Sequence, residues 1–149
     1  MRRVPETAVD AQRRNRRSLK LTGTVVRGLG ESASFLSIPW VANQITSMLN
    51  FSAYPGTLNI DVHSPGVQKT LKRHGTERIV PAEEGFCDAL VFKGTVAGRY
   101  PCGVILPLVP GYPASILEIV APVHLKQALG AADGDGVELE IYISFAYAV

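Results

Sequence analysis

The pattern of apolar and polar positions predicts a chain built mainly from short strands. Residues 19–26 are rich in β-branched side chains, and residues 57–62 alternate between apolar and polar types. Residues 137–145 alternate in the same way and are bounded by a glycine-rich turn. Further strands are expected in four places, at 34–38, 88–98, 102–108 and 116–120.

Two segments instead have a helical period. Residues 40–49 follow a proline and carry apolar side chains three and four positions apart, which predicts an amphipathic helix. Pro122 is expected to open a second helix, and Gly130 to close it. The stretch 63–85 is irregular, with a possible short helix at 67–73.

These elements predict the fold class. Strands and helices do not alternate regularly, which argues against a doubly wound parallel sheet. Six or seven strands with two short helices predict a mainly β fold, a small closed barrel with two short inserted helices. Residues 1–18 have no hydrophobic period and are expected to form a disordered basic tail ahead of one domain over residues 19–149.

The charge distribution changes what the composition suggests. The 149 residues carry a net charge of +2, but residues 1–20 carry +5 and the rest of the chain −3. A mildly acidic body with a basic tail makes nucleic acid an unlikely partner. No apolar run approaches the roughly 18 residues of a membrane span, and no secretory signal follows the first arginines. Cys87 and Cys102 lie in no disulfide or metal motif, so a cytoplasmic location is expected.

Polar residues on one predicted strand are the first candidates for chemistry. In residues 57–62 the side chains of Thr57, Asn59 and Asp61 share one face, because successive strand residues point to opposite sides. The hydroxyl and amide oxygens of Thr57 and Asn59 could hold one Mg²⁺ ion. A solvated strand face explains the same pattern, and on spacing alone it is the more common case.

Three further features each have a functional and a structural interpretation. The loop from Gly28 to Ala33 could present backbone N–H groups to phosphates, although it matches no Walker or dinucleotide motif and could be a simple turn. Glu118 lies inside an apolar strand and needs either a partner or a solvent-facing position. The helix start at Val123–Lys126 could bind an anion, as could any helix start.

The order of four sequence blocks resembles the archaeal-type riboflavin kinase family, which uses CTP. The similarity runs from about Leu19 to Ile143. The blocks are Gly28-Leu29-Gly30-Glu31, Tyr54-Pro55-Gly56-Thr57-Leu58-Asn59-Ile60, Leu117-Glu118-Ile119-Val120-Ala121-Pro122, and the segment from Leu129 through Gly134-Asp135.

This resemblance implies a six-stranded cradle-loop barrel that transfers the γ-phosphoryl group of CTP to riboflavin, giving FMN and CDP. It implies that Thr57 and Asn59 hold Mg²⁺. Glu118 is implied to contact the flavin, either accepting the hydroxyl proton or positioning the flavin. The implied ligand-binding residues are Gly28, Leu29, Gly30, Glu31, Ser32, Ala33, Val123, His124, Leu125 and Lys126 for the nucleotide, and Pro110 with Glu118 for the flavin.

Several positions depart from the family pattern. Ser32 and Ala33 replace a glycine and a larger, often basic residue, and Val109 and Pro110 replace a basic residue and a threonine. Lys126 stands where arginine is common, which keeps the charge and loses bidentate geometry. The pattern fits a divergent kinase or, alternatively, a non-catalytic flavin- or nucleotide-binding domain.

The charge count adds one expectation about the nucleotide. A body with a net charge of −3 must bind a polyanion, so backbone N–H groups, Mg²⁺ and Lys126 are expected to supply the attraction. A third possibility, nucleic-acid binding through the basic tail, predicts a salt-sensitive association that is lost without residues 1–18.

Overall fold

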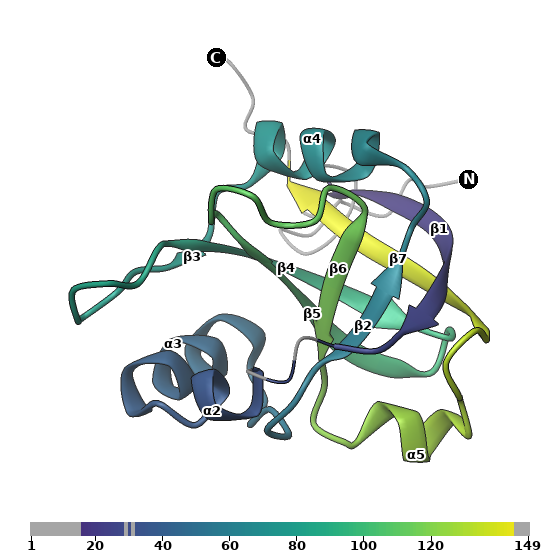
Figure 1. The fold of residues 1–149 in the computed structure, drawn as a ribbon, viewed down its shortest axis with the longest axis horizontal. Coiled ribbons are helices and arrows are strands. Elements are labelled where there is room, and N and C mark those ends of the chain that lie inside the picture. The colour runs from purple at the N-terminus through teal and green to yellow at the C-terminus, as the bar shows by residue number, and fades with distance from the viewer. Residues whose placement is uncertain (1–15, 29, 31, 145–149) are drawn as a thin grey trace, which may run out of the picture.

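Six antiparallel strands close into a barrel, as the pattern predicted (Figure 1). The computed structural model describes residues 16–28, 30 and 32–144. Around the barrel the order is β4-β5-β6-β2-β1-β7, and the pairing of β7 with β4 closes it. The strands are β1 (Arg16–Val26), β2 (Leu58–Asp61), β4 (Ala89–Val96), β5 (Tyr100–Pro107), β6 (Ile116–Val120) and β7 (Gly136–Ser144). A two-residue strand, β3 (Arg78–Ile79), pairs with the start of β4 outside the ring.

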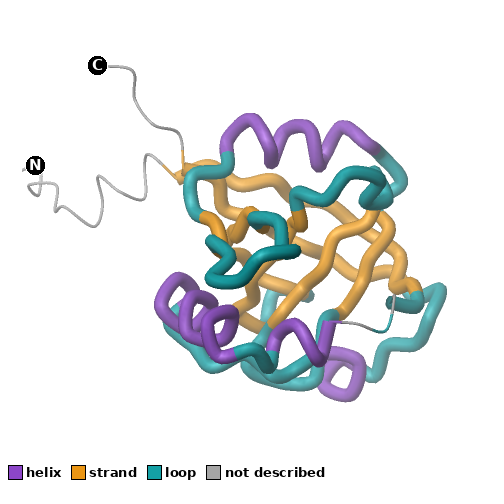
Figure 2. Tube along the Cα trace, turned by 60° about the vertical axis from the view of Figure 1, so that its left-hand side comes forward, coloured by secondary structure: helices purple, strands orange, loops and turns teal. Residues whose placement is uncertain are grey.

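Four short helices surround the strands (Figure 2). Helix α4 lies at one end of the barrel and helix α5 at the other, while α2 and α3 lie against its side (Figure 1). Their bounds are α2 (Ser32–Leu36), α3 (Pro39–Leu49), α4 (Pro65–His74) and α5 (Leu125–Leu129). No helix in the described part of the chain is long and apolar enough to span a membrane.

Two separate cores explain why some strands are apolar on both faces. The barrel interior contains alternate residues of every barrel strand, such as Ile60 and Leu117. A second core lies outside the barrel, where Val41 and Ile45 of α3 pack on Val91 and Ile105. Because α3 covers their outer faces, the middle parts of β4 and β5 read as continuous apolar runs rather than alternating ones.

A glycine brings α3 close to the sheet. A Cβ atom at Gly103 in β5 would overlap the end of the Leu49 side chain, so a larger residue there would require Leu49 to move. Helix α3 begins with Pro39 in its first turn and ends at Asn50, which adopts a left-handed conformation. The predicted helix over residues 40–49 is therefore confirmed.

The strand predicted at 34–38 is wrong, because residues 32–36 form helix α2. Phe35 and Leu36 pack against the second core and the aromatic residues around Trp40. A short apolar run without a clear period does not distinguish a strand from a buried helical turn, and tertiary packing decides.

Three element boundaries also differ from the predicted ones. Strand β1 begins at Arg16 rather than near Leu19, because it pairs with β7 from Arg16 onward. The possible helix at 67–73 is α4 and is longer, since Ser64 caps it by accepting a hydrogen bond from the N–H of Gly66. Helix α5 begins at Leu125 rather than Pro122 and is capped by His124. The described residues thus form four helices, where two and a possible third were predicted.

Closure of the barrel predicts a strong effect at Gly94. This residue lies where β4 pairs with β7, and a Cβ atom there would overlap the backbone carbonyl oxygen of Glu140. Gly94→Ala should lower the free energy of unfolding by about 1–3 kcal/mol, measured by urea denaturation. The matched control is Gly136→Ala, whose Cβ would lie 3.8 Å from Thr22 Cγ2 and should be nearly neutral. Equal stability of the two variants would contradict this account of closure.

Candidate active site

A cavity of about 820 Å³ lies against the outer face of the barrel, not in its interior. Its floor is formed by outward-facing residues of β1, β2 and β6, including Val26, Asn59 and Glu118. Its walls come from α2, from the segment between β3 and β4, and from the loop between β5 and β6. Segments distant in the sequence therefore meet here.

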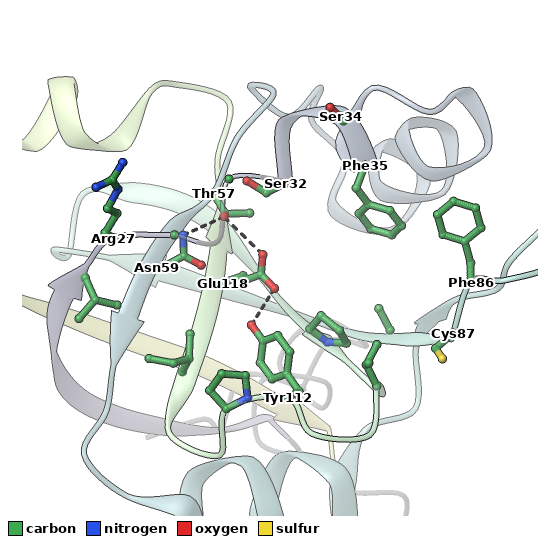
Figure 3. Close-up of a pocket in the computed structure, with 18 of the residues that line it drawn as sticks. Arg27, Ser32, Ser34, Phe35, Thr57, Asn59, Phe86, Cys87, Tyr112 and Glu118 are labelled. Atoms are coloured by element: carbon green, nitrogen blue, oxygen red, sulfur yellow. Dashed lines mark hydrogen bonds between the residues drawn. The ribbon is translucent and has the colours of Figure 1, made fainter.

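Three polar side chains form the centre of this cavity (Figure 3). Asn59 of β2 and Glu118 of β6 lie directly opposite each other in the antiparallel register, so their side chains share one face. Thr57 Oγ1 donates a 3.4 Å hydrogen bond to Glu118 Oε1 and accepts one of 3.2 Å from Asn59 Nδ2. The solvated strand face considered above is excluded for Asn59, since only 9% of this residue is exposed.

Burial changes the acidity of Glu118. Desolvation raises its pKa above the usual carboxyl range, and hydrogen bonds from Tyr112 and Thr57 act in the opposite direction. The Tyr112 hydroxyl donates to Glu118 Oε2 at 2.7 Å (Figure 3). Burial and the neighbouring carboxylate also raise the pKa of Tyr112, so this phenol stays protonated and remains the donor. Glu118 is thus more basic than an exposed carboxylate, which suits it to accept a proton.

Tyr112 depends on a buried contact from α4. Gln68 is only 4% exposed, and its side-chain amide donates to the carbonyl oxygens of Pro113 and Ile116 at 2.8 and 2.7 Å. These bonds hold the loop that carries Tyr112 against the barrel. Tyr112 was missed by the sequence analysis, where Gly111-Tyr112-Pro113 appeared only as a loop.

Gly28 is required by the position of Asn59. A Cβ atom at Gly28 would overlap Asn59 Nδ2, so the backbone of the loop after β1 lies directly on the Asn59 amide. Gly28, Gly30 and Ser32 all line the large cavity. The predicted loop therefore borders the polar centre.

A smaller pocket of about 220 Å³ adjoins the first. Its lining includes all four predicted residues of the helix start, Val123, His124, Leu125 and Lys126, together with the segment from Tyr54 to Leu58. Thr57 lines both cavities and so marks the place where they meet. A ligand in each cavity would have its nearer end at Thr57.

Two polar groups at the helix start beside the smaller pocket already have protein partners. Lys126 Nζ lies 2.8 Å from Asp133 Oδ1, so the cation expected to attract the nucleotide is neutralised by a neighbouring carboxylate. The N–H of Gln127 is bonded to His124 Nδ1. The expectation that Lys126 helps to attract the nucleotide stays a prediction, and Asp133 is the carboxylate with which a phosphate would compete.

The far end of the large cavity is apolar. Phe35 of α2 and Phe86 of the β3–β4 segment lie with ring centroids 6.2 Å apart and planes inclined by 30°. Trp40 packs on both rings and donates a 2.9 Å hydrogen bond to Glu83. This aromatic wall was not predicted, because Phe35 had been placed in a strand and Phe86 had been assigned to no element.

The remaining predicted residues lie elsewhere. Ala33 and Pro110 are exposed and line neither cavity, although their neighbours Ser32, Ser34 and Val109 line the larger one. Leu29 and Glu31 lie outside the described residues. The structure thus brings together Thr57, Asn59, Glu118, Gly28, Gly30 and Ser32 around one cavity.

The polar centre fits a hard divalent cation. Thr57, Asn59 and Glu118 offer hydroxyl, amide and carboxylate oxygens, the donor types that Mg²⁺ prefers. The described residues contain no group of three His, Cys, Asp or Glu side chains that could form a metal cage by themselves. Mg²⁺ is commonly held by few protein oxygens together with waters and substrate phosphates, so this donor set suits it.

The raised pKa of Glu118 predicts the direction in which stability changes with pH. The folded protein holds this proton more tightly than the unfolded chain, so wild-type stability should decrease as pH rises through the raised pKa. Glu118→Gln removes this effect. The variant should therefore be more resistant to urea than wild type at about pH 8, and the difference should shrink toward about pH 4.

Glu138→Gln serves as the control for this titration. Glu138 is exposed on β7, away from the cavity. Any change in stability that Glu138→Gln causes should not grow with pH as the change caused by Glu118→Gln does. An advantage of Glu118→Gln that did not grow with pH would contradict a desolvated Glu118.

Comparison with known proteins identifies the family. A family model named for CTP-dependent riboflavin kinase, and described as a domain of unknown function (DUF120), matches residues 25–141. The riboflavin kinase of Saccharolobus solfataricus is 30% identical over 132 residues, covering 85% of this chain and 75% of the relative. That of Pyrobaculum islandicum is 35% identical over 132 residues, but the match covers only 62% of that longer protein.

A relative of similar length is matched almost throughout. The riboflavin kinase of Sulfurisphaera tokodaii is 30% identical over 131 residues, which cover 84% of this chain and 96% of the relative. The matched region contains Thr57 and the strands that carry Asn59 and Glu118. The family that the four sequence blocks indicated is confirmed: the chain belongs to the CTP-dependent riboflavin kinases, a family of phosphotransferases.

Proposed function

We propose that this protein transfers the γ-phosphoryl group of CTP to the ribityl hydroxyl of riboflavin, giving FMN and CDP. The names of its relatives support riboflavin as the acceptor, and the name of the family supports CTP as the donor. The observation that carries the proposal is the cluster of Thr57, Asn59 and Glu118 where two cavities meet. Such a junction suits a reaction that joins two substrates.

The larger cavity suits the flavin. Its volume of about 820 Å³ and its wall of Phe35 and Phe86 fit a large planar ring system, which aromatic side chains bind by stacking. With the ring at this apolar end, the ribityl chain extends toward Glu118. This arrangement requires no basic residue at Val109 or Pro110, where the family pattern has one.

The smaller pocket and the loop after β1 suit the nucleotide. The pocket lined by Tyr54 and His124 is next to Thr57, and Gly28 lies directly on Asn59. The phosphates of a nucleotide bound here would end at the polar centre. Thr57 and Asn59 would hold Mg²⁺, which neutralises negative charge on the phosphates when bound.

Glu118 is assigned as the proton acceptor. Its carboxylate lies within hydrogen-bond reach of Thr57 and Tyr112, so its orientation is fixed before substrate binds. The raised pKa makes it a better base than an exposed carboxylate at neutral pH. Phosphoryl transfer otherwise depends on alignment and charge stabilisation, which the rigid strands β2 and β6 provide.

The direct test is product formation. The purified full chain should convert riboflavin to FMN in the presence of Mg²⁺ and CTP, as measured by chromatography of the flavins. ATP, GTP and UTP should react more slowly. Absence of FMN with all four nucleotides would overturn the kinase proposal, and calorimetric binding of riboflavin without turnover would then favour a flavin-binding domain.

A pH profile tests the role of Glu118. Protonation of Glu118 should abolish its function as a base, so kcat should fall on the acid side of the profile. Glu118→Gln should lower kcat by about 10²–10⁴-fold and remove this acid limb. Tyr112→Phe removes a hydrogen bond that lowers the Glu118 pKa, so the limb should move to higher pH.

The control for the tyrosine is Tyr100→Phe. The Tyr100 hydroxyl donates to the carbonyl oxygen of Ala128, and the residue lines neither cavity. Its profile should match that of wild type. An acid limb unchanged in both Glu118→Gln and Tyr112→Phe would contradict Glu118 as the base.

A further inference from the structure

Electrostatic neutralisation of the nucleotide is incomplete in the site described so far. A nucleoside triphosphate carries several negative charges, and its transferred group must approach the Glu118 carboxylate. Among the described residues that line the two cavities, the only Lys and Arg side chains are Arg27 and Lys126. The body of the chain has a net negative charge, so it does not supply a general attraction for the nucleotide.

Lys126 already has a protein partner. Its ammonium group is paired with Asp133 at 2.8 Å, and the two side chains are both accessible to solvent, at 40% and 54% exposure. Binding of a phosphate by Lys126 would have to compete with this carboxylate. His124 is also engaged, through Nδ1 with Gln127 and through its ring with Tyr54.

Arg27 differs from Lys126 in having no such carboxylate partner among the described residues. It is exposed, lines the large cavity, and makes no hydrogen bond or ion pair within the described part of the chain. It directly precedes Gly28, whose backbone lies on the Asn59 amide. Figure 3 shows Arg27 beyond Asn59, on the side of that residue opposite Glu118.

Strand pairing places the backbone of Arg27 relative to the polar centre. Val26, the last residue of β1, pairs with Asn59 of β2, and Asn59 pairs with Glu118 of β6. The order across the sheet is thus the Arg27 end of β1, then Asn59, then Glu118. An acceptor hydroxyl at Glu118 and a leaving group near Arg27 would lie on opposite sides of a phosphoryl group at Asn59.

We propose that Arg27 binds the phosphates of the nucleotide and stabilises the diphosphate that leaves. This inference rests on the proposed function and names a further residue of that site. The planar guanidinium can bind two phosphate oxygens at once, which a lysine cannot do. Because Arg27 has no partner among the described residues, its binding to phosphate breaks no ion pair with them.

The step is a simple displacement. The ribityl oxygen forms a bond to the γ-phosphorus, and its proton passes to Glu118. The bond between the γ-phosphorus and the oxygen that bridges it to the β-phosphate breaks. The electron pair stays on that oxygen of CDP, where Arg27 stabilises the added charge.

Binding of CDP tests this role without requiring turnover. Calorimetry with the full chain should show Kd for CDP about tenfold higher for Arg27→Gln than for wild type, as expected for one lost charge-assisted contact. Cytidine, which has no phosphate, should bind both proteins equally. Arg27→Lys should recover part of the lost affinity. The affinity for CDP should depend more strongly on salt concentration in wild type than in Arg27→Gln.

The control is Arg99→Gln. Arg99 is exposed in the β4–β5 turn, packs over the Tyr100 ring, and lines neither cavity. Arg99→Gln removes the same charge from the protein as Arg27→Gln does, so the Kd of this variant for CDP should equal that of wild type. Equal loss of affinity in Arg99→Gln and Arg27→Gln would indicate a general charge effect and overturn the inference.

Kinetics separate this inference from the proposed function. In the reaction with CTP, Arg27→Gln should raise KM for the nucleotide by about tenfold and lower kcat, while KM for riboflavin stays unchanged. FMN formation by wild type with unchanged nucleotide kinetics and CDP affinity in Arg27→Gln would overturn only the role of Arg27. Absence of FMN with wild type, combined with weaker CDP binding by Arg27→Gln, would overturn only the kinase proposal.

Discussion

The register of β2 against β6 is the constraint on which the site depends. Asn59 lies opposite Glu118, while Leu58 and Ile60 lie opposite Ile119 and Leu117 inside the barrel. A shift of either strand by one residue would turn its polar side chain into the apolar interior and bring an apolar one to the cavity. The core therefore fixes the register, and the register places an amide and a carboxylate side by side.

The other walls of the cavity follow from packing on the outer face of the barrel. Helices α2 and α3 bury the second core against β4 and β5, and this packing holds Phe35 at the cavity edge. The β3–β4 segment is tied to α3, because Gln44 accepts a hydrogen bond from Val80 and donates one back to its carbonyl oxygen. Trp40 of α3 packs on both Phe86 and Phe35. Structural packing and the shape of the site are thus determined together.

Glu118 represents a conflict between stability and function. Its burial disfavours the ionised form, yet Tyr112 and Thr57 provide hydrogen bonds that keep the carboxylate available. The apolar surroundings that raise its pKa are also those that bind an aromatic ligand. Such destabilising polar groups are typical of sites selected for activity rather than for stability.

The amino-acid sequence by itself determined the mainly β fold, most of the strands, helix α3 and the residues that carry the family resemblance. Alternation in residues 57–62 and 137–145 was sufficient, because a half-buried strand imposes a period of two. The sequence also indicated Thr57, Asn59 and Glu118, each as an isolated polar residue with an alternative explanation. Their convergence was not visible, since strand pairing between residues 59 positions apart leaves no local signal.

Only the tertiary structure decided the rest. Helix α2 is helical because its apolar residues pack on the second core, although the local sequence also suits a strand. Tyr112, Phe35, Phe86 and Arg27 became candidates only when the loop, the helix, the β3–β4 segment and the end of β1 were placed around one cavity. The pairing of Lys126 with Asp133 was likewise visible only in the tertiary structure. Ion pairs and cavities depend on distances through space, which the order of residues does not specify.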